Sequence, residues 1–216
     1  MPDRLAIFDF DGTLIPNPSS EWRFVHFLVR RKRLGLGDLA HSIAFAARWL
    51  PRYGRQVMKK NKAYLAGMKV TEAEALAREF VAEIVLPLLR PAVMARLHQH
   101  QPNGDTVALL TGAPSFIAQP ICEALAIRHC IACECEISAG HFLPLPPHRH
   151  PFGEEKLLLA RQLCEKLGQS MSQVTAYADS IHDRALLAEA GAAVAVAPDA
   201  ALAKLARQQN WPVLMF

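Results

Sequence analysis

Short runs of apolar residues recur along the chain, and most of the stretches between them have helical periodicity. A run that is apolar at successive positions has no polar face, which is typical of a strand covered on both sides in a parallel sheet. Three runs are clear and two are weaker, at Leu5–Phe10, Thr106–Thr111, Val174–Asp179, Ala192–Ala197 and Pro212–Phe216. Helical patterns lie at Ser115–Leu125, Glu154–Leu167, Asp183–Ala190 and Ala200–Gln209. The alternation predicts an α/β fold with a Rossmann-like, doubly wound parallel sheet.

The connection between the first two predicted strands is long, at roughly 90 residues without a convincing strand. A loop of this length is improbable in a compact domain, so we expect a helical cap at residues 16–96, inserted into a core of residues 1–15 and 97–216. Pro and Gly at 15–18 and 102–104 mark the expected hinges. The helical patterns are Ser20–Arg31, Asp38–Trp49 and Thr71–Arg90, the last with a capping box of Thr71 and Glu74.

A third kind of pattern occupies Cys130–Leu145, where alternating residues lead into a turn at Ser138-Ala139-Gly140 and a second short apolar segment. Alternation on both sides of a turn indicates two antiparallel strands. We therefore expect a short β-hairpin attached to the core.

The composition supports a globular protein. Half of the 216 residues are hydrophobic (51%), a fifth are charged (20%), and the formal net charge is +4, which argues against disorder or a fibrous chain. The five cysteines form no regular framework, so free thiols in a reducing compartment are expected. No apolar run resembles a signal peptide or reaches the roughly 18 residues that span a bilayer. We expect a cytoplasmic protein, with an oligomeric state that the sequence leaves open.

Two carboxylates follow the first predicted strand directly, in Asp9-Phe10-Asp11-Gly12-Thr13. Ligands of open α/β sheets bind beyond the carboxyl ends of the strands, and alternation points Asp9 and Asp11 to the same side. Gly12 allows the backbone to turn where a larger residue would crowd a ligand. Two such carboxylates repel each other unless a cation or a shared proton relieves them. The simpler alternative is a turn with a capping acid.

Further polar residues follow the other predicted strands or open a helix at the same edge. They are Thr111 and Gly112, Asp179 and Asp183, and Lys156 in the first turn of its helix. Each has an ordinary alternative role, as a turn hydroxyl, a helix cap or a solvated charge. Together they predict phosphoryl transfer. Mg²⁺ would relieve the carboxylates, one carboxylate would attack phosphorus, and the second would act as acid and base.

These stretches resemble the haloacid dehalogenase superfamily, and most closely its subfamily IB, the phosphoserine-phosphatase-like branch. The matching segments, in the family's order, are Asp9–Leu14, Leu110–Gly112, Gly153–Lys156 and Tyr177–Asp183. The resemblance implies a Mg²⁺-dependent phosphatase of a small organic phosphate monoester, with an aspartyl-phosphate intermediate. It also implies that the helical insertion is a C1-type cap.

By the same resemblance, Asp9 is the nucleophile and Asp11 the acid–base. Thr111, Lys156, Gly12, Gly112 and His182 would contact the phosphate. Asp9, the backbone carbonyl of Asp11 and Asp179 would hold Mg²⁺, with Asp183 acting through water or orienting Lys156.

Two positions depart from the branch. His182 stands where an Asn is usual, and Pro18 stands about where an acid often precedes the cap, with Glu21 nearby. Phosphoserine, histidinol phosphate and a lysophospholipid or glycerol phosphate all remain possible substrates. A phosphate-binding or membrane-docking module with a compromised site is a further alternative.

The expected cap is strongly basic between residues 21 and 62, where eleven Lys or Arg face only Glu21 and Asp38. A solvated surface, steering of an anionic substrate, and contact with an anionic membrane through apolar Ala40–Trp49 are the three interpretations. Membrane contact is the least favoured of these, and no motif indicates nucleic acid. The histidines at 141, 148 and 150 could form a cluster near Pro-rich turns, but an exposed loop is the favoured expectation. Cys133-Glu134-Cys135 lacks the second Cys pair that a zinc site needs.

Overall fold

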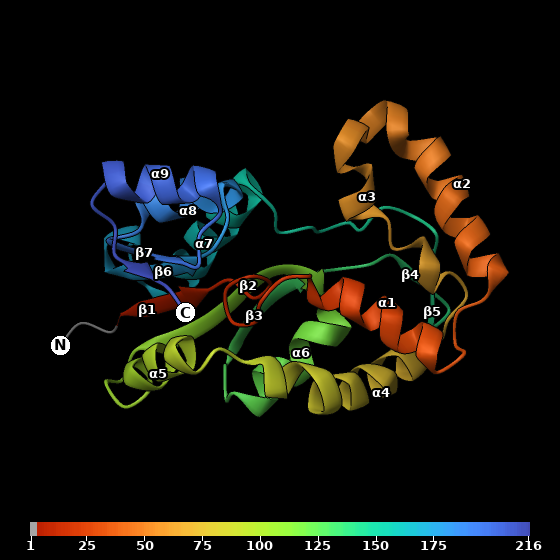
Figure 1. The fold of residues 1–216 in the computed structure, drawn as a ribbon, viewed down its shortest axis with the longest axis horizontal. Coiled ribbons are helices and arrows are strands. Elements are labelled where there is room, and N and C mark those ends of the chain that lie inside the picture. Colours follow the sequence, from red (N-terminus) through yellow and green to blue (C-terminus); the bar gives the residue numbers. More distant parts are fainter. Residues whose placement is uncertain (1–3) are drawn as a thin grey trace.

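A six-stranded parallel sheet forms the centre of the protein (Figure 1). The computed structural model describes residues 4–216. The strand order is β3-β2-β1-β6-β7-β8. Strands β2 and β3 therefore lie on one side of β1, and β6, β7 and β8 lie on the other. The crevice beyond the carboxyl ends of β1 and β6 is where such sheets bind ligands. The strands are β1 Leu5–Phe8, β2 Thr106–Pro114, β3 His129–Cys133, β6 Val174–Ala178, β7 Ala192–Val196 and β8 Val213–Leu214.

Helices cover both faces of this sheet, which confirms the predicted doubly wound α/β fold (Figure 1). Leu5 and Ile7 of β1 pack toward α7, α8 and α9, while Ala6 and Phe8 belong to the core that includes α5 and α6. Alternate residues of β1 therefore belong to two apolar cores, one on each face of the sheet. The helices are α5 Pro91–His100, α6 Ser115–Ala124, α7 Glu154–Leu167, α8 Arg184–Glu189 and α9 Ala200–Gln208. No helix within residues 4–216 is both long and apolar enough to cross a membrane.

The inserted segment after β1 is helical, as expected. It contains α1 Ser20–Arg30, α2 Leu36–Tyr53, α3 Val57–Lys60 and α4 Val70–Phe80. Phe24 of α1 packs its ring 5.3 Å from that of Phe80 and 5.5 Å from that of Phe116 in α6, so α1 and α4 share the core of the sheet. Helices α2 and α3 stand away from the sheet (Figure 1) and have a small core of their own, formed by Phe45, Val57 and Ala63.

The expected single helix at Thr71–Arg90 with a Thr71 cap is wrong. Helix α4 begins at Val70, because Lys69 forms an isolated β-bridge with His141 and the Val70 N–H donates to Gly140 O (3.0 Å). Thr71 therefore lies inside the first turn of the helix. The helix gives way to a π turn before Pro87, which has no N–H to continue the hydrogen-bond ladder. Short turns of 3₁₀ or π type lie at Gly54–Gln56, Ala63–Leu65, Val81–Val85, Leu86–Leu88, Met171–Gln173 and Ile181–Asp183.

The expected hairpin at Cys130–Leu145 is correct only in its second half. Its first half is β3, which pairs in parallel with β2, Ala108 opposite His129. The hairpin consists of β4 Ile137–Ser138 and β5 His141–Phe142. Ala139 and Gly140 join them with φ values of +47° and +76°, the left-handed geometry of a two-residue hairpin turn. All five cysteines are free thiols, as expected.

Candidate active site

The chain turns sharply where β1 ends, and this turn presents the first two carboxylates. The carbonyl oxygen of Phe10 accepts from the N–H groups of Thr13, Leu14 and Ile15, which closes a tight loop. Gly12 in this loop has φ +85°, and a Cβ added there would lie 1.9 Å from Asp179 Oδ2. Only glycine therefore lets the Asp179 carboxylate approach the backbone that follows Asp9.

A buried ammonium connects two of the predicted acids. Lys156 Nζ, in the first turn of α7, lies 2.8 Å from Asp9 Oδ1 and 2.8 Å from Asp183 Oδ2. Burial disfavours its charge, but the two carboxylates outweigh that effect and raise the pKa of Lys156 above its ordinary value. Lys156 is therefore charged at every physiological pH.

This single ammonium does not balance the carboxylates around it. Burial raises the pKa of Asp9 to about 6 against the attraction of Lys156, and burial with the charges of Asp9 and Asp183 raises the pKa of Asp179 to about 7. Raised pKa values mean that the ionised forms are poorly compensated. The cluster has an excess of negative charge for which a hard divalent cation is the natural partner.

The donor set fits Mg²⁺ better than a metal that needs many protein ligands. Within residues 4–216, no three His, Cys, Asp or Glu side chains converge on one point that could hold a metal ion. Mg²⁺ keeps several waters and uses one or two carboxylates together with substrate oxygens. Asp9, Asp179 and the backbone carbonyl of Asp11 offer such a set, while Asp183 is occupied by Lys156.

Asp11 lies at the start of the first cap helix. Its carboxylate accepts from Ser20 N (2.6 Å) and Ser20 Oγ (3.1 Å), so it faces the N-terminus of α1. Burial raises the pKa of Asp11 to about 7; the Ser20 N–H works against this and the Asp9 charge adds to it. A carboxyl group with a pKa near 7 can both donate and accept a proton at physiological pH.

One cleft of about 740 Å³ collects the predicted residues. Asp9, Asp11, Thr111, Gly112, Lys156, Asp179, His182 and Asp183 all line it. Gly12 does not line the cleft; its role is that it has no side chain where the Asp179 carboxylate lies. The structure therefore brings together residues from four distant segments at the edge of the sheet.

The remaining predicted phosphate contacts occupy different depths of this cleft. Thr111 is buried and its Oγ1 accepts from the N–H of Ala113 (3.0 Å). Gly112 passes close to the following loop, since an added Cβ would meet Pro151 O at 3.3 Å. His182 is exposed at the rim, with its ring 4.6 Å from that of Phe152.

The expectation that the histidines share an exposed loop is wrong for His150. Its side chain is buried in the cleft, and burial together with four nearby lysines lowers its pKa to about 3, so it is neutral. His148 instead pairs with Glu134 (2.7 Å), and His141 bonds to Ala139 O in the hairpin. No periodicity or motif in the sequence marks His150 for burial.

The cap contributes a second buried ion pair to the cleft. Lys62, which the sequence places in a solvated basic run, is 2% exposed and donates to Glu21 and to Lys59 O (3.0 Å). Tyr64 Oη donates to the other Glu21 oxygen (3.1 Å). The charge of Glu21 is thus already matched by this chain's own lysine.

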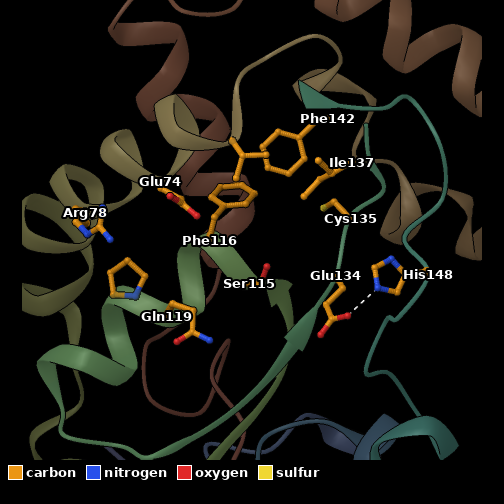
Figure 2. Close-up of a pocket in the computed structure, with 12 residues that line it drawn as sticks. Glu74, Arg78, Ser115, Phe116, Gln119, Glu134, Cys135, Ile137, Phe142 and His148 are labelled. Carbon is orange, nitrogen blue, oxygen red and sulfur yellow. Dashed lines mark hydrogen bonds and ion pairs between the residues drawn. The ribbon is translucent and has the colours of Figure 1, made fainter. Parts of the chain in front are cut away.

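A smaller cavity of about 310 Å³ lies away from the carboxylates, between α4, α6 and the hairpin (Figure 2). Phe116 and Phe142 form its apolar wall, and the Glu134–His148 pair lies on its rim. It contains none of the predicted site residues. The acid cluster of the larger cleft is therefore the candidate active site.

Comparison with known proteins agrees with this fold. The haloacid dehalogenase-like hydrolase family matches residues 6–188, and the chain belongs to that family. A histidinol-phosphatase of Neisseria meningitidis serogroup C (strain 8013) is 30% identical over 98% of each chain. A Bordetella pertussis Tohama I protein of unknown function is 28% identical, with a TM-score of 0.82 over 100% of this chain and 99% of that one.

A phosphoserine phosphatase, solved as a phospho-aspartyl intermediate analogue, shares the fold. Its TM-score is 0.65 at 15% identity, over 99% of this chain and 93% of that one. Within the hydrolase family, the protein is a phosphatase, which confirms the enzyme class expected from the sequence.

Proposed function

We propose that the protein hydrolyses a small organic phosphate monoester through an aspartyl-phosphate on Asp9, with Mg²⁺ as cofactor. The observation that carries this proposal is the contact of one lysine ammonium with Asp9 and Asp183, while the charges of these two acids also act on Asp179. A phosphate dianion is repelled by such a cluster unless further positive charge is present. Asp9, Asp179 and the backbone carbonyl of Asp11 would hold Mg²⁺, which would supply that charge and polarise the phosphoryl oxygens.

Asp9 and Asp11 would each act in both half-reactions. In the first, an Asp9 carboxylate oxygen bonds to phosphorus, the ester P–O bond breaks, and protonated Asp11 gives its proton to the leaving alkoxide. In the second, Asp11, now ionised, takes a proton from water as the water oxygen attacks phosphorus. The bond between Asp9 and phosphorus then breaks and inorganic phosphate leaves. A pKa near 7 suits Asp11 to both roles.

Other groups of the cleft would hold the phosphoryl oxygens during these steps. Lys156, Thr111 and Gly112 line the same cleft as Asp9 and offer an ammonium, a hydroxyl and a backbone N–H as donors. Fixed donors of this kind stabilise the charge that spreads over the equatorial oxygens in the transition state. A phosphate contact by His182 stays a prediction, as do the division into cap and core at residues 16–96 and the cytoplasmic location.

Metal removal tests the proposal directly. We expect EDTA-treated protein to lose turnover of p-nitrophenyl phosphate, and MgCl₂ to restore it, with KCl of equal ionic strength as the control. Full turnover after EDTA treatment would contradict the metal requirement.

Mg²⁺ should also raise the melting temperature, and more at about pH 8 than at about pH 5. Only ionised carboxylates bind the ion, and Asp9 and Asp179, with pKa values of about 6 and about 7, hold protons in acid. At a hundredfold excess over Kd, a rise of about 5–10 °C is expected at the higher pH. A rise that is equal at both pH values, measured by differential scanning fluorimetry, would place Mg²⁺ binding elsewhere.

The leaving-group side of the cleft indicates how the substrate is recognised. Glu21 is an acid of the cleft that could meet a substrate amine, but Lys62 and Tyr64 already contact both of its carboxylate oxygens. Lys59 adds a further positive charge to the same wall. We infer that Glu21 positions Lys62 and does not by itself select a cationic leaving group.

Glu21→Gln distinguishes these two roles. If Glu21 positions Lys62, kcat/KM should fall by a similar factor, about tenfold, for histidinol phosphate, phosphoserine and glycerol phosphate. If Glu21 binds an amine, the loss should be confined to the first two substrates. Glu72→Gln is the matched control, because Glu72 pairs with Arg33 (3.1 Å) outside the cleft.

A further inference from the structure

An apolar stripe runs along the outer side of α2. Leu36, Leu39, Ile43 and Leu50 are 86%, 57%, 62% and 54% exposed, although all four are large hydrophobic side chains. Their spacing repeats about every three to four or seven residues, so they share one side of the helix. Single exposed leucines are ordinary, but four in line on one helix mark a surface that is used for contact. We call these four residues the α2 stripe.

The segment of chain that carries the α2 stripe is strongly basic. Between residues 30 and 60 the chain carries nine Lys or Arg and one acid, Asp38. Two of the basic residues, Arg31 and Arg33, pair with acids of α4 or the turn after it. Within residues 4–216, no Asp or Glu lies at ion-pair distance from Arg48, Arg52 or Arg55, which are available to an external anion.

Two of these arginines lie over an aromatic ring, that of Trp49, which packs against the small core of Phe45, Val57 and Ala63. The guanidinium groups of Arg48 and Arg52 lie 5.6 Å and 5.9 Å from the ring centre of Trp49. A helix with an exposed apolar stripe and several basic side chains is suited to the boundary between lipid headgroups and acyl chains.

We propose that the α2 stripe docks on an anionic phospholipid surface. The leucine and isoleucine side chains enter the headgroup region, and the net positive charge of this segment attracts the lipid phosphates. A second copy of the chain is a poorer partner, because pairing two α2 helices would bring two strongly basic segments together. An anionic surface gains from the same charge that opposes self-association.

Docking would bring the active site close to the membrane. Ser42 of α2, with Met58 and Lys59 of α3, also lines the cleft that holds the carboxylates. Met58 is 66% exposed, so an apolar side chain of α3 is accessible at the cleft. A phosphate ester at the headgroup level would then reach the cleft from the docked face.

Vesicle co-sedimentation of the full chain tests the proposal. We expect binding to phosphatidylcholine vesicles that contain about one third phosphatidylglycerol, weakened by salt, and no binding to pure phosphatidylcholine. Leu39→Glu combined with Ile43→Glu should weaken binding at least about tenfold, because two apolar anchors are lost and two negative charges are added. Leu158→Glu is the matched control, since Leu158 is 53% exposed on α7 and should leave binding unchanged.

Three results would overturn the proposal. They are equal binding to neutral and anionic vesicles, undiminished binding by the double variant, and a lipid-free dimer of the parent that the double variant dissociates. The last result would assign the α2 stripe to a second copy of the chain. Unchanged turnover of p-nitrophenyl phosphate and an unchanged melting temperature show that the double variant is folded. Because binding is measured without substrate, its loss is distinguishable from failure of the proposed phosphatase mechanism.

Discussion

Asp9→Asn should reduce phosphatase turnover by about 10⁴-fold or more. The amide has nearly the size of the carboxylate but cannot form an acyl phosphate. The fold should survive, because Lys156 keeps its contact with Asp183 (2.8 Å). Steady-state turnover of p-nitrophenyl phosphate measures the loss. Mass spectrometry after an acid quench should detect a phosphorylated protein in the parent and none in the variant.

Asp105→Asn is the control for this experiment. Asp105 is also partly buried and hydrogen-bonded, to His100 Nδ1 (2.7 Å), but it precedes β2 at the opposite edge of the sheet. Its replacement should leave turnover intact. Comparable activity in Asp9→Asn and the parent would show that another group attacks phosphorus, and the proposed mechanism would then fail.

The strands and the convergence of the acids could be predicted because both depend on local pattern. A run such as Leu5–Phe8 is apolar on both faces, and that condition is met in few places other than the middle of a covered sheet. Once the strands are parallel, the residues that follow them share one edge. Asp9 and Asp179 therefore meet in the structure although 170 positions of sequence separate them.

The edge strand β3 illustrates where local pattern fails. Three of its five residues are only partly buried, so its pattern resembles one arm of a two-sided hairpin. Its true partner is β2, and that pairing depends on how α6 returns the chain to the sheet. The local sequence does not contain this information.

The burial of Lys62 and His150 in the cleft also could not be predicted from local pattern. Lys62 lies within a run of basic residues that suggests a solvated surface, and His150 lies between prolines in an irregular loop. Both are buried because distant groups enclose them, Glu21 in the first case and the wall of the cleft near Gly112 in the second. Burial of a polar side chain by a distant partner has no periodic signature in the sequence.

Lys156→Met should cause the largest combined loss of stability and activity. It removes the ammonium that contacts both Asp9 and Asp183 and leaves the two carboxylates buried. Breaking a buried pair in this way typically costs about 3–5 kcal/mol in the free energy of unfolding. Turnover should fall by about 10³-fold or more, because a fixed donor to the phosphoryl oxygens is lost as well. Urea denaturation and steady-state kinetics measure the two effects.

The loss of stability should depend on pH in a defined direction. Lys156 lowers the pKa of Asp9, so in the variant this pKa rises above the parent's value of about 6 and lies well above the ordinary 3.8. A carboxyl group whose pKa is raised in the folded state binds protons more readily when folded, so acid stabilises the fold. The deficit of the variant should therefore be greatest above about pH 7 and shrink as the pH falls toward 5. A deficit that is constant over this range would mean that the lost contact is one of packing and not of charge.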